Sequence, residues 1–320
     1  MSLSSYIFRK FLSNPSEALK LRRAGNEIKD YATWKLYSIL EEYGLLQIFQ
    51  ERSWWEFKDR DLAKLVSDIL VEEGIANRAG DRVKIVSEPK KPQITTQEAA
   101  DMVPVFDNAI QALPRALESG EKPGLSDIKP VYAKLLGNFA VKLEIESAID
   151  SAGIDKLGEN TVIVDIHPRI GVSTLALLEM TRSKIIVVEP YASNIDVIKG
   201  MVKISGGENR VTFIQSPLEE MKLPEKADVI FMAEVIHWTM NPRLVMMRAR
   251  DSLKPKGLLV VAQSLYSSTG LVAALPGYIL GALALPPTSD QLKELIEGAG
   301  FKIVKWLESL GVAIVVASPS

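Results

Sequence analysis

The feature that most constrains the fold is an alternation of short apolar strands and helical segments after residue 160. Residues 161–164 form a run of mostly β-branched side chains, typical of a strand buried on both faces, and a helical pattern follows from Ser173 to Thr181. The same unit recurs, which predicts further strands at 184–188, 210–214, 227–232 and 257–262 and helices near 192–204, 241–253 and 289–298. This alternation predicts an α/β fold with a parallel sheet and helices on both faces. Residues 301–318 predict two more antiparallel strands, which would make a mixed seven-stranded, Rossmann-like sheet.

The first hundred residues have a different pattern. Helical spacing of apolar residues over 26–49 and 61–73 is followed by a predicted hairpin with its turn at 79–81, an order typical of a winged helix. A helix that enters a DNA groove should be basic, but 61–73 carries one basic residue, Lys64, against four acidic ones. We therefore expect no nucleic-acid partner. The predicted domains are a winged-helix-like dimerisation domain, 1–96, and a Rossmann-like domain, 97–320, whose residues 97–155 are linking helices.

Composition excludes several kinds of site. The chain has no cysteine and two histidines, which rules out thiolate and histidine-rich metal sites, and we expect no metal. The net charge of −2 argues against a polyanion-binding surface. Pro276 and two glycines interrupt the apolar stretch 270–287, which predicts a buried or pocket-lining segment rather than a membrane span. With no apolar signal-peptide core at the start, we expect a cytoplasmic protein without a membrane partner.

The ends of the predicted strands carry the acidic residues that indicate chemistry. Asp165 ends the first strand, and Glu189, followed by Pro190, ends the second. A carboxylate at the second position is placed to accept hydrogen bonds from a ribose diol. The sequence lacks a G-x-G-x-x-G turn, a P-loop and a G-x-S-x-G elbow, which disfavours dinucleotide, nucleoside-triphosphate and standard α/β-hydrolase functions.

Six segments in this order resemble the class I S-adenosylmethionine-dependent methyltransferases, most closely the winged-helix O-methyltransferases of the caffeate and hydroxyindole type. They are VIVDIHPRIG, KIIVVEP, RVTFIQSPLEEMKLP, DVIFMAEVIHW, LKPKGLLVVAQ and GAGFKIVKW. The resemblance implies S-adenosyl-L-methionine as cofactor, a homodimer, and methylation of a small, largely apolar, hydroxyl-bearing acceptor.

The resemblance also implies roles for individual residues. His237 falls on the family's general base and is expected either to deprotonate or to orient the acceptor. The implied acceptor residues are Met232, Trp238, Met240 and Tyr278. The implied cofactor residues are Asp165, His167, Arg169, Gly171, Glu189, Pro190, Gln215, Ser216, Ala233 and Glu234.

The first of these motifs departs from the family pattern of acid-x-Gly-x-Gly-x-Gly. His167 and Arg169 replace two of the three glycines, and Pro168 lies between them. In one interpretation Arg169 pairs with the carboxylate of the cofactor. In another, cofactor binding is lost and the fold serves as a non-enzymatic binding or regulatory protein. Methylation of nitrogen or carbon is a further alternative, and the sequence leaves the acceptor unidentified.

Overall fold

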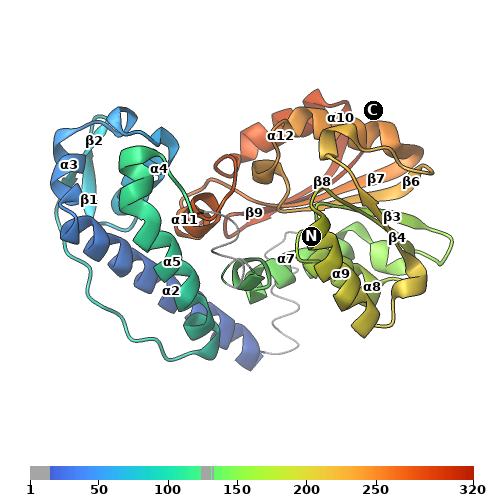
Figure 1. The fold of residues 1–320 in the computed structure, drawn as a ribbon, viewed down its shortest axis with the longest axis horizontal. Coiled ribbons are helices and arrows are strands. Elements are labelled where there is room, and N and C mark those ends of the chain that lie inside the picture. Colours follow the sequence, from blue (N-terminus) through green and yellow to red (C-terminus); the bar gives the residue numbers. More distant parts are fainter. Residues whose placement is uncertain (1–14, 124–130, 132) are drawn as a thin grey trace. The chain divides into compact units, whose positions relative to one another are not determined.

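The computed structural model describes residues 15–123, 131 and 133–320, and the chain divides into two compact units (Figure 1). The sheet unit includes residues 136–265 and 286–320. The helical unit includes residues 9–135 and 266–285. The sheet unit contains every strand of the predicted Rossmann-like region.

The sheet unit is built on a mixed seven-stranded sheet, as predicted. Its strands lie in the order β5-β4-β3-β6-β7-β9-β8, with the first five parallel and β9 antiparallel to both neighbours. Strand order reverses at β3, so the crevice at its carboxyl end is the position where such sheets bind ligands. The strands are β3 (Val162–Ile166), β4 (Lys184–Glu189), β5 (Val211–Gln215), β6 (Ala227–Ala233), β7 (Leu253–Ser264), β8 (Phe301–Ser309) and β9 (Val312–Pro319).

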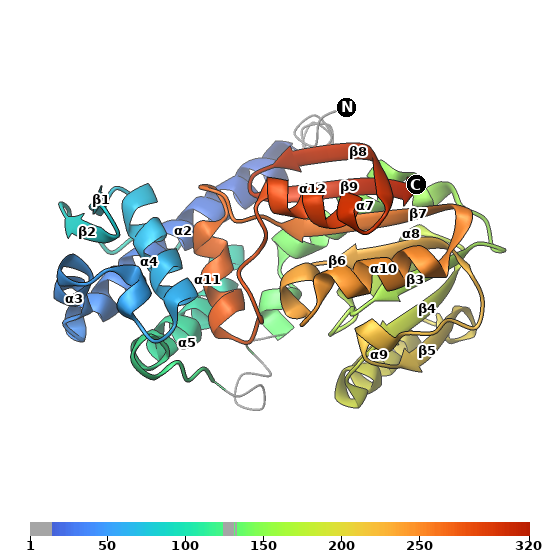
Figure 2. The ribbon, with the colours of Figure 1, turned by 90° about the horizontal axis from the view of Figure 1, so that it is seen from above.

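Helices cover both faces of this sheet (Figures 1 and 2). On one face lie α7 (Phe139–Ala152), α8 (Val172–Met180) and α9 (Ala192–Ile204), whose apolar residues form one core with the strands. On the other lie α10 (Pro242–Ser252) and α12 (Ser289–Gly298), which contribute to a second core. All five β3 side chains are buried because these two layers cover the sheet. Short 3-10 turns occur at Ile154–Lys156, Glu208–Arg210, Leu218–Glu220 and Ile236–Trp238.

The helical unit has its own continuous apolar core. Its elements are α2 (Pro15–Glu42), α3 (Leu45–Glu51), a 3-10 turn (Trp54–Glu56), α4 (Arg60–Glu72), β1 (Ala76–Ala79), β2 (Arg82–Ile85), α5 (Gln97–Ser119) and α11 (Leu271–Ile279). The strands β1 and β2 form an antiparallel hairpin directly after α4, in the predicted order. A winged-helix assignment and dimerisation stay predictions.

The boundary between the units differs from the predicted boundary at residue 96. Helix α5 packs along α2, and α11 packs on α4 and α5, so these segments belong with the N-terminal residues. Their apolar faces are buried there: Phe106, Ile110 and Leu113 on α5 and Leu275 on α11 are at most 4% exposed. The apolar stretch around Pro276 is therefore buried, as predicted.

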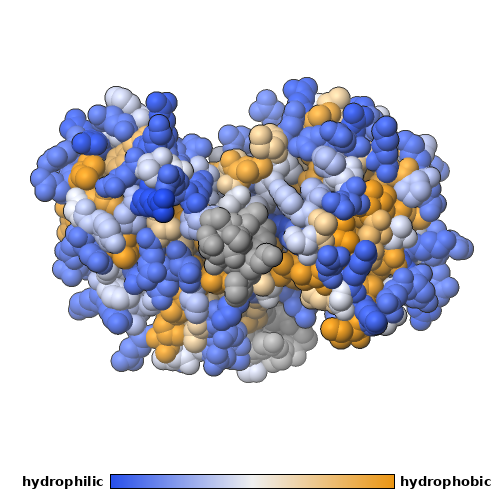
Figure 3. All heavy atoms as spheres, viewed as in Figure 1, coloured by the Kyte–Doolittle hydropathy of each residue, from blue (hydrophilic) through white to orange (hydrophobic). Residues whose placement is uncertain are grey.

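No helix in the described ranges combines the length and apolarity that a membrane crossing requires. Hydrophilic side chains are spread over much of the surface that Figure 3 shows.

Candidate active site

The turn between β3 and α8, residues 167–171, has a backbone that glycine would adopt easily. His167 and Arg169 have φ angles of 54° and 58°, in the left-handed region that costs an L-residue about 1–2 kcal/mol. Gly171 has φ 87°, and a Cβ there would lie 3.1 Å from Ile198 Cγ1. The turn thus keeps a glycine-like backbone while presenting two large side chains.

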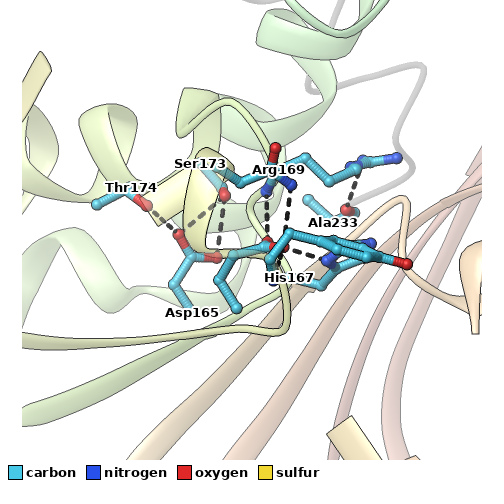
Figure 4. Close-up of polar contacts among 9 residues, drawn as sticks. Asp165, His167, Arg169, Ser173, Thr174 and Ala233 are labelled. Carbon is cyan, nitrogen blue, oxygen red and sulfur yellow. Dashed lines mark hydrogen bonds and ion pairs between the residues drawn. The ribbon is translucent and has the colours of Figure 1, made fainter. Parts of the chain in front are cut away.

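Asp165, at the end of β3, is bonded within the protein. The hydroxyls of Ser173 and Thr174, in the first turn of α8, donate to its carboxylate at 2.9 and 2.6 Å (Figure 4). Burial raises the pKa of Asp165 to about 7, against the lowering effect of these two hydrogen bonds. Its side chain is fully buried, so it ties α8 to the strand.

Glu189, at the end of β4, accepts four hydrogen bonds from its own chain. Its Oε2 lies 2.9 Å from Nδ1 of His167 and accepts from the backbone N–H of Arg169 at 3.1 Å. Its Oε1 accepts from the backbone N–H of Tyr191 and the side-chain amide of Asn194, at 3.2 and 3.0 Å. The residue is 0% exposed. The imidazole of His167 therefore occupies a position on Glu189 that a ribose hydroxyl would need.

Arg169 extends from the same turn toward the end of β6 (Figure 4). Its Nη2 donates to the backbone carbonyl of Ala233 at 3.2 Å, and its guanidinium lies 5.2 Å from the ring centre of Trp238. Its Nε and Nη1 have no hydrogen-bond partner among the described residues, although the side chain is only 4% exposed. Burying such donors unsatisfied is costly, so this guanidinium is suited to an anionic partner.

A second polar group follows β6. Glu234 has φ 56° and accepts from the backbone N–H of Ser264, while its Oε2 lies 3.6 Å from Nε2 of His237. Nδ1 of His237 lies 2.9 Å from the amide nitrogen of Gln263. Burial lowers the pKa of His237 to about 4 despite the opposing charge of Glu234. The imidazole is therefore neutral at physiological pH.

Glu144, on α7, completes this group. It is 7% exposed, and its carboxyl group lies beside that of Glu234. Burial, together with the neighbouring charge of Glu234, holds its pKa well above its ordinary value. Two carboxyl groups placed near each other away from water disfavour a second negative charge, which is the physical cause of this shift in the pKa of Glu144.

The structure groups some of the predicted residues and separates others. The β3–β4–β6 edge brings His167 and Arg169 to Glu189 and Ala233, and His237 to Glu234. Half-buried Pro190 follows Glu189, Gln215 is exposed at the end of β5, and the Ser216 hydroxyl donates to the carbonyl of Pro217.

The expected acceptor residues differ in burial and in the compact unit to which they belong. Met232 is fully buried in the sheet core, whereas Met240 is 83% exposed. Tyr278 belongs to the helical unit, where its hydroxyl donates to Asp59 at 3.0 Å. Trp238 contacts a predicted cofactor residue, Arg169.

Three functional candidates escaped the sequence prediction: Glu144, Asn194 and Gln263. Asn194 lies one helical turn into α9, so its proximity to Glu189 could have been predicted from strand and helix spacing. Gln263 is close to the end of a predicted strand, but Glu144 gives no local signal because it lies in an ordinary helical pattern. Within the described ranges, no three histidine, aspartate or glutamate side chains are grouped to hold a metal ion.

Comparison with known proteins explains this arrangement of strands. Residues 164–261, which run from β3 into β7, match the family described as a methyltransferase domain. The match includes Glu189 and His237 and begins one residue before Asp165. A comparison of the sequence with curated proteins gives no match.

Solved structures with the same fold extend the likeness to nearly the whole chain. The O-methyltransferase family 2 protein from Planctomyces limnophilus, solved in complex with apigenin, has a TM-score of 0.64 at 14% identity and covers 93% of this chain and 96% of its own. The DszA carbon methyltransferase gives 0.66 at 19%, with coverages of 95% and 92%. The mitomycin 7-O-methyltransferase MmcR gives 0.56 at 15%, with 99% and 100%. At these identities the likeness establishes the Rossmann-like methyltransferase fold with an N-terminal helical domain.

Proposed function

We propose that this chain is an S-adenosylmethionine-dependent methyltransferase that acts on a small, largely apolar, hydroxyl-bearing acceptor. The proposal rests on the match of residues 164–261 to a methyltransferase domain together with one observation, the buried guanidinium of Arg169, two of whose nitrogen donors have no partner among the described residues. A buried cation whose hydrogen-bond donors are only partly used favours an anionic ligand, and the methionine part of the cofactor carries a carboxylate.

The fit to the cofactor differs between its two ends. At the carboxylate end, Arg169 supplies free donors and Ala233 a backbone carbonyl acceptor. At the ribose end, Glu189 is the right kind of acceptor, but His167 already holds it. We therefore infer that cofactor binding requires the imidazole of His167 to leave Glu189. When bound, the cofactor would supply an electrophilic methyl group, and His237 would orient the acceptor.

Calorimetric titration with S-adenosylmethionine and with its demethylated product tests this function. We expect measurable heat for both ligands and weaker binding for Arg169→Met, which keeps side-chain length but removes the charge. Lys199→Met, a substitution on α9 away from this edge, is the control and should bind as the wild type does. Absence of heat and of any thermal shift at millimolar ligand would rule out the proposed function.

A second candidate is a non-enzymatic binding or regulatory protein on the same fold. The observation that favours it is the full hydrogen bonding of Glu189 by its own chain, with no exposed surface. It predicts no cofactor binding even after the side chain of His167 is removed.

Nitrogen or carbon is an alternative acceptor atom, since methylation of either needs no hydroxyl. Homodimerisation through residues 1–96 stays a proposal that sedimentation velocity would test.

A further inference from the structure

The amide of Gln263 has one possible orientation. Its Oε1 faces the backbone N–H of Ile236 at 3.1 Å, and its Nε2 lies 3.0 Å from the carbonyl oxygen of Ser264. A backbone N–H only donates and a backbone carbonyl only accepts, so both ends of the amide are fixed. The NH₂ group must therefore face His237, with Nε2 lying 2.9 Å from Nδ1.

This orientation determines where the imidazole carries its proton. Because the amide donates to Nδ1 of His237, Nδ1 must hold a lone pair, and the neutral ring carries its hydrogen on Nε2. That Nε2–H faces Oε2 of Glu234 at 3.6 Å. An imidazolium would direct Nδ1–H against the amide hydrogens of Gln263. With its lone pair engaged and its other nitrogen protonated, this ring is a hydrogen-bond donor toward Glu234.

The groups that face the imidazole come from three places in the fold. Glu234 follows β6, Gln263 lies on β7, and Arg169 and His167 belong to the β3–α8 turn. The positive charge of Arg169 disfavours an imidazolium, and burial does so more strongly. Glu234 is the one group among them that would stabilise it by charge, and it lies beside Glu144 on α7.

The carboxyl pair has the features of a proton acceptor. Glu234 is held in a left-handed backbone conformation, and such strain in a non-glycine residue is concentrated at functional sites. Its Oε1 is fixed by the backbone N–H of Ser264. Oε1 of Glu144 is buried without a partner among the described residues, so this pair has an unused oxygen.

We propose that Gln263 is a positioning residue that holds His237 as the Nε2–H tautomer, and that the Glu144–Glu234 carboxyl pair, not the imidazole, accepts a proton at this edge of the sheet. In that step the acceptor's O–H bond breaks and its proton passes to a carboxylate oxygen of the pair, which neutralises the charge of that carboxylate. The proton-accepting role rests on the proposed function, whereas the tautomer does not.

Nitrogen-15 NMR of the full chain tests the tautomer directly, since the chain has two histidines. His167→Gln assigns the remaining ring to His237. We expect an unprotonated Nδ1 and a protonated Nε2 between pH 8 and about pH 5.5. Gln263→Glu should move the proton to Nδ1 or produce an imidazolium, because a carboxylate accepts where the amide donated. Gln263→Met, which keeps volume but removes the donor, should leave a mixture of tautomers. A wild-type ring with Nδ1 protonated, or one that titrates above pH 6, overturns the inference.

Measurements of turnover test separately whether the Glu144–Glu234 pair accepts the proton. Glu234→Gln should lower kcat about a hundredfold with cofactor affinity unchanged, and it should flatten the acid limb of the pH profile. His237→Asn, which keeps a donor near the same place, should lose less than tenfold. The reverse ranking would assign proton acceptance to His237. No turnover and no cofactor binding by the wild type would refute the proton-accepting role together with the proposed function, while the NMR result decides the tautomer alone.

Discussion

Replacing His167 by glycine should make cofactor binding tighter. In the wild type, the ribose end of the cofactor must first displace the imidazole from Glu189, which lies 2.9 Å away. A hydrogen bond to a charged group contributes about 1.5–3 kcal/mol. Because 1.4 kcal/mol is a factor of ten in an equilibrium constant, His167→Gly should lower Kd by about 10- to 100-fold.

The substitution also changes the backbone, and this effect needs its own control. Glycine adopts the φ of 54° at residue 167 without strain, in the free and bound protein alike, so strain relief should not alter affinity. Leu310, in the β8–β9 turn, has φ 53° and a side chain that is 73% exposed. Leu310→Gly should therefore raise unfolding stability by about 1 kcal/mol and leave cofactor affinity unchanged.

Isothermal titration of the wild type and both variants gives three distinct outcomes. Tighter binding by His167→Gly alone supports displacement of the imidazole. Equal or weaker binding by this variant would refute the competition, since the imidazole would then assist the cofactor or lie outside its site. No binding by any of the three proteins would favour the non-enzymatic interpretation.

Two stability predictions concern the same turn. The pKa of Asp165 is raised from 3.8 to about 7, so the folded state holds a proton that the unfolded state releases. The resulting stabilisation of the folded state, about 4 kcal/mol, is fully present below pH 4 and is lost as the pH rises through 7. In urea titrations across that range, Asp165→Asn should give a flatter profile of unfolding free energy than the wild type, and an unchanged slope would contradict the buried-acid assignment. Gly171→Ala should cost about 1–3 kcal/mol, because φ is 87° and the new Cβ would lie 3.1 Å from Ile198. The control Gly200→Ala, in α9 with open space at its Cβ, should be neutral or stabilising, and equal stabilities for the two variants would show that the turn relaxes freely.

The fold was predictable because each strand of the parallel sheet is a short apolar run with clear limits. Strands β3, β4 and β6 match the predicted ranges within two residues at each end. Strand β7 begins at Leu253 rather than 257, because half-buried Lys254 and exposed Lys256 extend the strand with charged side chains that give no apolar signal. The domain boundary was harder to predict, because α5 and α11 acquire their partners only through tertiary packing.

The candidate site was predictable only where residues sit at strand ends. Asp165 and Glu189 were predicted because parallel strands bring their carboxyl ends to one edge, and His237 was predicted because the segment DVIFMAEVIHW resembles a motif of the methyltransferase family. Their partners were not, since a sequence cannot show that the imidazole of His167 would bond to Glu189 or that a helical glutamate, Glu144, would contact Glu234. Met232 was expected at an acceptor site, but a central strand covered on both faces buries its side chain in the core.

The two side chains that replace glycine in the β3–α8 turn act on different parts of the edge, which makes their effects separable. His167 bonds to Glu189, an acceptor that a ribose would use, whereas Arg169 bonds to the carbonyl of Ala233 and keeps two donors unused. A turn that had only lost its function would have no reason to bury a guanidinium with unsatisfied donors, since an exposed arginine is less costly. The buried arginine therefore favours a retained anion site. The hydrogen bond between His167 and Glu189 determines the free energy that a ligand must supply to bind Glu189 as well.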